Sequence, residues 1–222
     1  MGSLSAPDGE SRRASGSQAT PIVFVVDDDV SVLESLEPLI RFAGWMPQTF
    51  ESARAFLARP RSDVPSCLVL DVSLPDLNGL DLQTRIAADR SDMPIIFITG
   101  YGDVPMTVRA MKAGAVEFLT KPFDQEVLLA AIRSAIERSR LALDREVELR
   151  TLREREASLT PREREVMELV VGGKLNKQVG GKLGISEITV KAHRGHLMRK
   201  MKADSLADLV TMAAKLRSSP TQ

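Results

Sequence analysis

Carboxylate, hydroxyl and ammonium side chains occur at four places in the first 121 residues of this 222-residue chain where they could act together. Three aspartates, Asp27–Asp29, follow the apolar run IVFVV, and Asp71 follows CLVL. Carboxylates crowded at one site repel each other unless a cation lies among them, and such oxygen ligands suit Mg²⁺. A cation there also neutralises charge while a carboxylate accepts a phosphoryl group. Thr99 and Lys121, after two further apolar runs, offer groups that bind phosphoryl oxygens.

Each of these residues also has an ordinary structural explanation. Aspartates that follow strands often form turns or cap helices, and Asp71, which precedes a loop with the sequence VSLPDLNG, could serve a turn. Thr99 could be a simple strand-end hydroxyl, and Lys121 could be a surface lysine. The chemical interpretation therefore depends on whether the elements before these residues bring them to one crevice.

Short apolar runs alternate with amphipathic segments from Pro21 onward, which predicts strands that alternate with helices. The predicted strands are Ile22–Val26, Trp45–Phe50, Cys67–Leu70, Pro94–Ile98 and Val116–Leu119, of which Trp45–Phe50 is the weakest and an edge. The predicted helices are Ser31–Ala43, Ser52–Ala58, Leu80–Ala88 and a fourth between Asp103 and Gly114.

This alternation is typical of α/β proteins with a doubly wound, five-stranded parallel sheet. In the strand order 2-1-3-4-5 the first and third strands are neighbours, and the site lies beyond the carboxyl ends of the strands. The aspartates, Thr99 and Lys121 all follow predicted strands, so they are expected to converge at that edge. The convergence favours the chemical interpretation over separate turns and caps.

Two residues inside these elements are unusual. Pro38 lies in the middle of the first predicted helix, where it should kink or shorten the helix because proline lacks an N–H group. Cys67, the single cysteine, lies in an apolar strand, which favours a small buried hydrophobe over a reactive thiol. One cysteine allows no disulfide within the chain and fits a cytoplasmic protein.

The charge balance differs between the two ends of the chain, although acidic and basic residues number 30 each. Residues 21–124 carry 15 acidic and 9 basic side chains, a balance of −6, whereas residues 158–222 carry 6 and 12, a balance of +6. The basic half is the one that could approach nucleic acid. No apolar run is long enough to cross a membrane. Residues 1–20 are polar without a signal-peptide core, which predicts a disordered arm.

A long charged helix is predicted after Asp124, which can cap it, and it should extend past residue 150. Its later part, residues 138–156, is dense in arginine and glutamate with several pairs four residues apart. Such pairs are typical of a solvated helical linker. A short dimeric coiled coil is the alternative, although fewer than three clean heptads are visible.

Four short helices and no strand are predicted after Leu159. Their ranges are Pro161–Val171, Lys177–Leu183, Glu187–Met201 and Leu206–Leu216. The first begins with a typical capping signal, in which Thr160 is the cap and Glu163 is the third helical residue. A short helix, a tight turn at Gly184–Ser186 and a basic helix predict a helix-turn-helix whose second helix enters the major groove of DNA.

The segment EITVKAHRGHLMRKM, residues 187–201, would carry most of the DNA contacts. We expect three apolar residues to face the core, namely Ile188, Leu197 and Met201. Four basic residues should face outward, namely Lys191, Arg194, Arg199 and Lys200. A charged helix can equally be a solvated face.

Among these residues, Lys191 and Arg194 could reach base edges or phosphates, while Thr189 and Lys177 could hold backbone phosphates. The histidines of the same helix, His193 and His196, lie three residues apart. A metal site there would need third and fourth ligands, which are not near in the sequence.

The motifs of the first half, VVDDD, LDVSLPDLNGL and ITGYGDVPMTVRAMKAGAVEFLTKPF, resemble the receiver domain of response regulators, closest to the FixJ type, over residues 21–135. The resemblance implies a CheY-like fold in which Asp71 is the phosphoacceptor. It also implies that Mg²⁺ is the cofactor, bound by Asp27, Asp28, Asp71 and the backbone carbonyl of Ser73.

The same resemblance assigns roles in switching to three further residues. Thr99 matches the switch hydroxyl, and Lys121 matches the lysine whose peptide bond to Pro122 is usually cis in this family. Phe118 stands where many receivers have a switch tyrosine, so an aromatic ring that swings inward is preserved but its hydroxyl is not.

Residues 158–217 resemble the four-helix output domain of the LuxR/NarL/FixJ class. This resemblance implies a DNA-binding domain over residues 158–222, joined to the receiver by a helical linker over residues 136–157. Lys191, Ala192 and Gly195 match base-contacting positions, and Arg194 could replace the contact that Gly195 lacks. Gly180-Gly181 stand where better helix formers are usual, which should weaken that helix by up to about 1 kcal/mol per glycine.

Together the two resemblances imply a DNA-binding response regulator of a two-component system. A sensor histidine kinase would phosphorylate Asp71, and the resulting homodimer would bind a pseudo-palindromic operator in double-stranded DNA, with RNA polymerase as a further partner. The chain would not be an enzyme, because the receiver catalyses only its own phosphorylation and dephosphorylation.

Two other classes are compatible with parts of the sequence. An aspartate-based phosphohydrolase normally needs an aspartate two residues after its nucleophile, and Ser73 occupies that position. A nucleoid or adaptor protein that works without phosphorylation would carry a vestigial acidic site.

Overall fold

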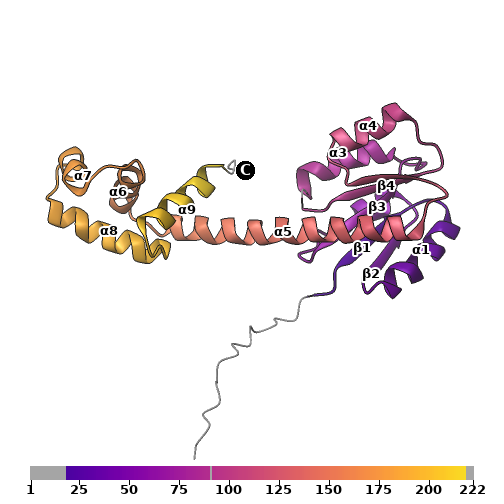
Figure 1. Cartoon of the computed structure of the whole chain (residues 1–222), viewed down its shortest axis with the longest axis horizontal. Coiled ribbons are helices and arrows are strands. Elements are labelled where there is room, and N and C mark those ends of the chain that lie inside the picture. The colour runs from indigo at the N-terminus through magenta and orange to yellow at the C-terminus, as the bar shows by residue number, and fades with distance from the viewer. Residues whose placement is uncertain (1–18, 91, 219–222) are drawn as a thin grey trace, which may run out of the picture. The chain divides into compact units, whose positions relative to one another are not determined.

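The structure is a computed structural model that describes residues 19–90 and 92–218 (Figure 1). The chain divides into two compact units, Met1–Leu141 and Ala142–Gln222. All five strands of the described residues lie in the first unit, and helices α6–α9 lie in the second. The arm predicted to be disordered, residues 1–20, lies outside the described residues except for Ala19 and Thr20.

The first unit is built on one parallel sheet with the predicted strand order, β2-β1-β3-β4-β5. The strands are β1 Ile22–Val26, β2 Met46–Phe50, β3 Ser66–Asp71, β4 Ile95–Thr99 and β5 Glu117–Thr120. The inner strands β1, β3 and β4 are buried along their whole length, as expected for parallel strands covered on both faces. Asp71 and Thr99 are the last residues of β3 and β4, so the sheet itself fixes their positions.

Helices cover both faces of the sheet (Figure 1). They are α1 Val30–Phe42, α2 Ala53–Leu57, α3 Gly79–Asp89, α4 Val104–Lys112 and α5 Gln125–Ala157. Successive side chains of a strand point to opposite faces, so alternate residues of β1 enter different cores. Phe24 joins the core beneath α2, α3 and α4, whereas Val23 and Val25 join the core beneath α1 and α5.

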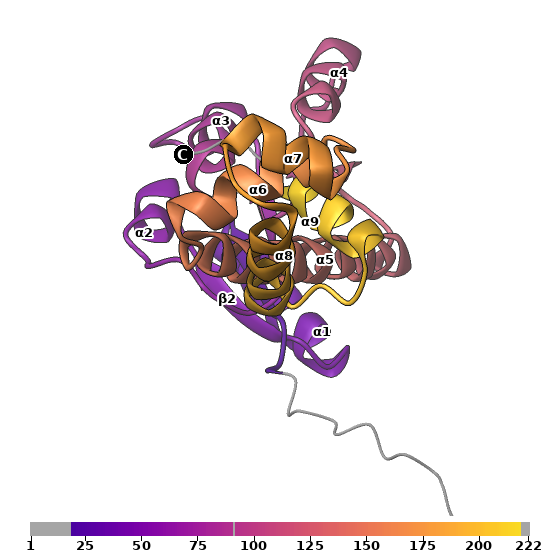
Figure 2. The ribbon, with the colours of Figure 1, turned by 90° about the vertical axis from the view of Figure 1, so that its left-hand side faces the viewer.

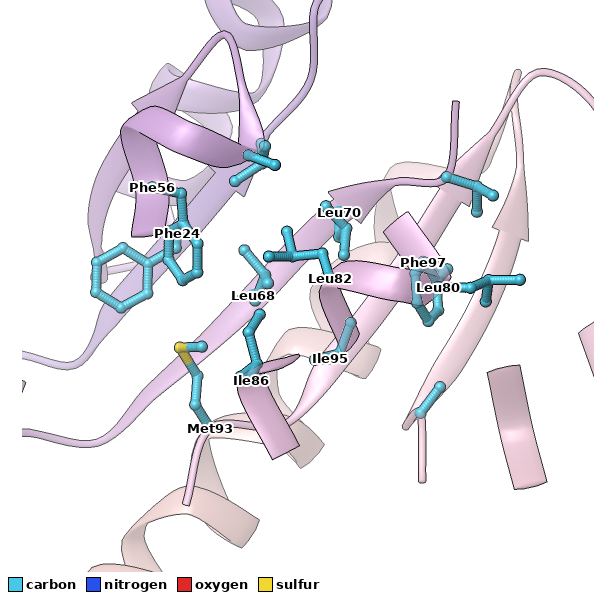
Figure 3. Close-up of a cluster of buried hydrophobic side chains, with 14 of the residues drawn as sticks. Phe24, Phe56, Leu68, Leu70, Leu80, Leu82, Ile86, Met93, Ile95 and Phe97 are labelled. Atoms are coloured by element: carbon cyan, nitrogen blue, oxygen red, sulfur yellow. The ribbon is translucent and has the colours of Figure 1, made fainter. Parts of the chain in front are cut away.

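The core beneath α2, α3 and α4 is closed by aromatic and aliphatic side chains from several elements (Figure 3). The rings of Phe24 and Phe56 meet edge to face with their centroids 5.6 Å apart. Leu68, Leu82 and Ile86 continue this core between β3 and α3. Burial of these apolar surfaces holds the helices against the sheet and thereby fixes the ends of the strands.

Pro38 does not shorten α1, which differs from the prediction for this helix. α1 runs without interruption over 13 residues, with Pro38 inside it. Pro38 lies on the exposed side, whereas Leu33, Leu36 and Ile40 are buried against the sheet. Packing on the opposite side therefore maintains the helix across the hydrogen bond that proline cannot make.

α5 is a single helix of 33 residues, and its start agrees with the prediction. The side chain of Asp124 accepts hydrogen bonds from the amides of Glu126 and Val127 at 2.7 and 3.4 Å. The first part of α5 packs on the sheet, where the buried hydroxyl of Ser139 accepts a bond from the amide of Ser66 at 3.0 Å. Residues 136–157, predicted to be a helical linker, are helical throughout.

The second unit contains four short helices around a small core of apolar side chains. Figure 2 shows the ribbons of these helices from the side of α8. They are α6 Pro161–Val171, α7 Asn176–Leu183, α8 Glu187–Met201 and α9 Leu206–Ser218. The predicted capping box is present at the start of α6, between Thr160 and Glu163. Gly184 ends α7 in the left-handed conformation, with φ of 66°, which a glycine adopts at no steric cost.

Three predictions about α8 are wrong, of which the one for Arg194 is described with the candidate site. Ile188 was expected in the core but is 81% exposed, and Val190 is completely buried instead. Lys200 was expected to face outward, but it is half-buried and its ammonium group bonds to the carboxylate of Glu163 at 2.6 Å. The buried stripe of α8 is Val190, Leu197 and Met201, so the core-facing side begins two residues later than expected.

Candidate functional site

The carboxyl edge of the sheet gathers the polar residues singled out in the sequence. Asp27 follows β1, Asp71 ends β3, Thr99 ends β4 and Lys121 follows β5. Asp27 and Thr99 are completely buried and Asp71 is 5% exposed. Parallel pairing of neighbouring strands brings these residues together although up to 94 positions separate them in the chain.

Lys121 holds two of the carboxylates at once. Its ammonium nitrogen donates to Oδ2 of Asp27 and to Oδ2 of Asp71, each at 2.6 Å. Burial alone would lower the pKa of Lys121, but these two hydrogen bonds outweigh that effect and raise its pKa above the ordinary value. Burial raises the pKa of Asp27, which the bond from Lys121 opposes. The ammonium group thus compensates for two carboxylates that the fold brings together.

Asp27, Asp28 and Asp71 form an acidic cluster that could hold a metal ion. One carboxylate oxygen from each of the three lies within 4.8 Å of the others, and Asp28 is exposed to solvent. Oxygen donors of this kind fit a hard divalent cation. Asp29 serves the fold instead, because its side chain caps α1 through the amide and hydroxyl of Ser31.

The loop after β3 is held by hydrogen bonds and a close backbone contact. The amide of Ser73 donates to Oδ1 of Asp71 at 2.8 Å. A Cβ atom on Gly79 would lie 2.6 Å from the carbonyl oxygen of Asp71, so only glycine allows the start of α3 to approach β3 this closely. Asp76 in the same loop accepts bonds from the amides of Ala53 and Arg54 at 3.3 and 3.0 Å and so caps α2.

Thr99, Gly102 and Phe118 pack against one another beside the acidic cluster. The hydroxyl of Thr99 donates to the carbonyl of Tyr101 at 3.1 Å and accepts from the amide of the same residue at 3.2 Å. Phe118 is half-buried, with its ring centroid 6.1 Å from that of Phe97. A Cβ atom on Gly102 would lie 3.0 Å from the ring of Phe118 and 3.5 Å from the methyl group of Thr99. A shift of Thr99 therefore affects both the loop to α4 and the aromatic ring.

The outward side of α8 is the second candidate site. Five of its residues are exposed at helical spacing: Ile188, Lys191, Ala192, Gly195 and Arg199. Lys191 makes only a loose pair with Glu187, at 3.6 Å. Lys177 is exposed on α7, whereas Thr189 is half-buried and its hydroxyl lies 2.8 Å from the hydroxyl of Ser186.

Arg194 does not face outward as expected. It is half-buried, and its guanidinium group donates to the side-chain oxygen of Asn176 at 2.6 Å, which ties α8 to the start of α7. His193 and His196 belong to no metal-like group in residues 19–90 and 92–218, where the acidic cluster is the one group found. His196 instead lies 3.8 Å from the carboxylate of Glu163.

Glu163 joins α6 to α8 from a buried position, with 3% of its surface exposed. Its carboxylate accepts from the ammonium group of Lys200 at 2.6 Å and from the amide of Thr160 at 2.9 Å. These bonds hold the pKa of Glu163 at about 2. The sequence identified Glu163 as a capping residue but gave no signal of its pairing with α8, 37 residues later.

Two family models match the chain, one in each unit. Residues 23–133 match the response regulator receiver domain, and residues 157–213 match the luxR family of bacterial regulatory proteins. The chain belongs to the response regulators. It combines a receiver domain with a LuxR-type DNA-binding domain, as transcriptional regulators of two-component systems do.

Similar proteins align with this chain over most of their length. The chain is 53% identical to nodulation protein W of Bradyrhizobium diazoefficiens over 195 residues, which cover 88% of this chain and 86% of that protein. It is 42% identical to the transcriptional regulatory protein FixJ of the same species, over 87% of this chain and 94% of FixJ. The solved structure of the response regulator StyR aligns with a TM-score of 0.79 and 46% identity, covering 89% of this chain and all of StyR.

Three further predictions from the sequence, of which the first comes from the resemblance to receiver domains, can be compared with the structure. The Lys121–Pro122 peptide bond is cis. Cys67 is completely buried, which raises the pKa of its thiol and agrees with a structural role. None of the helices in the described part of this response regulator is long and apolar enough to cross a membrane.

Proposed function

We propose that Asp71 accepts a phosphoryl group from a sensor histidine kinase and that the modified receiver controls DNA binding through α8. The observation that carries this proposal is the placement of the Lys121 ammonium group, 2.6 Å from carboxylate oxygens of both Asp27 and Asp71. A cation already bonded to the acceptor carboxylate is suited to the phosphoryl oxygens that will join it.

Mg²⁺ would be held by Asp27, Asp28, Asp71 and the backbone carbonyl of Ser73. When bound, it would neutralise charge on the phosphoryl group. The side chains of this chain then have three tasks: Asp71 supplies the attacking oxygen, Lys121 pairs with the new charge, and Thr99 donates a hydrogen bond to it. The receiver acts only on its own phosphorylation and dephosphorylation.

Thr99 and Phe118 would transmit the effect of phosphorylation at Asp71 to the surface of the receiver. Thr99 must release the carbonyl of Tyr101 before its hydroxyl can donate to a phosphoryl oxygen, which alters the loop before α4. Phe118 would fill the space that Thr99 leaves. We infer that residues 103–135 then form a receiver dimer, since a two-fold dimer places two output domains on a pseudo-palindromic operator.

The protein would act in the cytoplasm, and RNA polymerase would be the partner that responds to its binding on DNA. On DNA, Lys191, Ala192 and Gly195 would lie against base edges, and Thr189 and Lys177 would hold phosphates. Exposure of Lys177 and Lys191 supports these roles.

Labelling with acetyl phosphate and Mg²⁺ tests the phosphoacceptor. Transfer makes an aspartyl phosphate on Asp71 and releases acetate, so mass spectrometry of the intact chain should show one added phosphoryl group. Asp71→Asn should abolish the adduct, and the control Asp63→Asn, in the exposed loop before β3, should keep it. Continuous turnover without a stable adduct would favour a phosphohydrolase, and no reaction at all would favour a vestigial site.

Binding to a selected operator tests the DNA contacts. If Lys191 contacts a base, Lys191→Ala should reduce the difference in binding free energy between the operator and other sequences by about 1–3 kcal/mol. Lys177→Ala should weaken binding to all sequences alike and flatten the dependence on salt. Equal, sequence-independent losses in both variants would refute base reading by Lys191.

A further inference from the structure

Ile188 is a large apolar side chain that the fold leaves in solvent at the start of α8. It is 81% exposed, although it is the second residue of a helix whose next residues include the buried Val190. The side chain of Ser186 caps the helix through the amide of Thr189 at 3.1 Å, which fixes where the helix begins and therefore which side Ile188 faces.

Ile188 shares its face with the residues proposed to read bases. Residues three, four and seven positions apart lie on one side of a helix, so Ile188 aligns with Lys191, Ala192 and Gly195. All four are exposed. A Cβ atom on Gly195 would meet nothing within 4 Å, so space is open on this face one turn beyond Ala192.

The chemistry of this stripe combines apolar groups with cations. The side chain of Ile188 and the methyl group of Ala192 form its apolar part, and Lys191 and Arg199 supply positive charge. The positive charge suits a polyanion, and the apolar part suits a methyl group presented at the floor of a groove. In the major groove of DNA, the 5-methyl group of thymine is the apolar feature that side chains contact.

We propose that Ile188 is a specificity-determining residue that packs against the 5-methyl group of a thymine in each half-site. This inference rests on the proposed function, in which α8 enters the major groove. Contact with the methyl group removes apolar surface of Ile188 from water, which gives the exposed side chain a favourable partner in the complex.

Replacement of thymine by deoxyuridine tests this contact, because it removes the methyl group and leaves base pairing unchanged. The operator is first selected from random DNA with the phosphorylated full-length chain. Each thymine of a half-site is then replaced singly, and affinity is measured for the wild type, for Ile188→Ala and for Val147→Ala. Val147 is a second exposed aliphatic residue, on α5, and serves as the matched control.

The wild type and Val147→Ala should lose about threefold to fivefold in affinity at one thymine position, the size expected for one buried methyl group. Ile188→Ala should bind the thymine operator more weakly and should not distinguish thymine from deoxyuridine there. Its thermal unfolding should match the wild type, because the residue is exposed.

Retained DNA binding without any position sensitive to the methyl group would overturn this inference and leave the proposed function intact. The same holds if Ile188→Ala lost affinity equally on both operators, which would indicate a partner other than the methyl group. Absence of sequence-specific DNA binding by the wild type would overturn the proposed function itself, and this inference with it.

Discussion

The polar site at the carboxyl edge of the receiver sheet and the outward face of α8 differ in how far their side chains are buried and paired. At the edge of the sheet, Asp27, Asp71 and Thr99 are at most 5% exposed, and each has a hydrogen-bonding partner at 2.6–3.2 Å. On α8, Ile188 is 81% exposed and the side chain of Lys191 is 65% exposed, with one loose ion pair. The site proposed for phosphoryl transfer thus consists of mutually bonded groups, whereas the site proposed for DNA binding consists of side chains open to solvent.

The difference follows from what each site must bind. Transfer of a phosphoryl group needs charges held at fixed positions away from water, and buried charges are tolerable only when they are paired. Recognition of DNA needs side chains that can reach a large external surface, which bonds within the protein would prevent. Substitutions at the edge of the sheet should thus strongly change the rate of phosphorylation. Substitutions on the outward face of α8 should change affinity for DNA with little effect on folding.

Lys121→Met should have the largest effect and tests the first half of this contrast. Removal of the ammonium group from between Asp27 and Asp71 should slow labelling by acetyl phosphate about 10²-fold or more, because one preorganised charge is lost. Lys112→Met, on the exposed side of α4, is the control and should label at the wild-type rate. If Lys121→Met were labelled within threefold of the wild-type rate, the bonds from Lys121 to Asp27 and Asp71 would not be needed for phosphorylation.

Glu163→Gln tests whether a buried pair can also matter in the output unit. We expect a loss of about 1–3 kcal/mol in the stability of this unit, since Lys200 and Thr160 lose charge-assisted hydrogen bonds. Glu165→Gln, which breaks only an exposed pair with Arg162, should change stability by less than about 1 kcal/mol. Far-UV circular dichroism during urea unfolding follows the helices, while fluorescence of Trp45, the single tryptophan, reports on the receiver.

Glu163 should make the stability of the output unit fall at acidic pH. The pKa of Glu163 is about 2 in the folded chain, below its ordinary value of 4.5, so the unfolded chain binds more protons between these values. The contribution of Glu163 is complete above about pH 4.5 and is lost as the pH falls towards 2. Glu163→Gln should lack this component, and an unchanged pH profile in the variant would refute the assignment.

Gly181→Ala should have the smallest effect, a gain of about 0.5–1 kcal/mol in the stability of the output unit. A Cβ atom on Gly181 would meet nothing within 4 Å, whereas one on Gly180 would lie 2.7 Å from the carbonyl oxygen of Ile185. Gly180→Ala should therefore gain less or lose stability in the same urea titrations. Equal gains in stability at both positions would show that the turn between α7 and α8 can shift to accommodate a methyl group at position 180.

The strand order and the gathering of polar residues at one edge of the sheet were predictable. Both depend on local signals and on the rule that sites of parallel sheets lie beyond the carboxyl ends of the strands. Apolar runs marked the strands, and each was followed by a polar residue that the fold then places at one edge. The cap at Asp124 and the capping box at Thr160 are likewise local, and both are present.

Features that depend on long-range packing were not predictable. Pro38 looked disruptive because the sequence does not show that buried residues on the other side of α1 maintain the helix. Ile188 looked like a core residue because it is apolar, although nine residues separate it from Leu197, which places the two on opposite sides of a helix, and Val190 is buried instead. Arg194 and Lys200 looked like outward cations because their partners, Asn176 and Glu163, lie 18 and 37 residues away.

The most direct test of control by Asp71 is the affinity of the full-length chain for its operator with and without acetyl phosphate and Mg²⁺, measured in parallel with Asp71→Asn. Phosphorylation should tighten operator binding by the wild type about tenfold or more, with dimers appearing in sedimentation, and Asp71→Asn should show neither change. Operator affinity that stayed the same in a fully phosphorylated wild type, or that rose equally in Asp71→Asn, would contradict the claim that Asp71 controls DNA binding through α8.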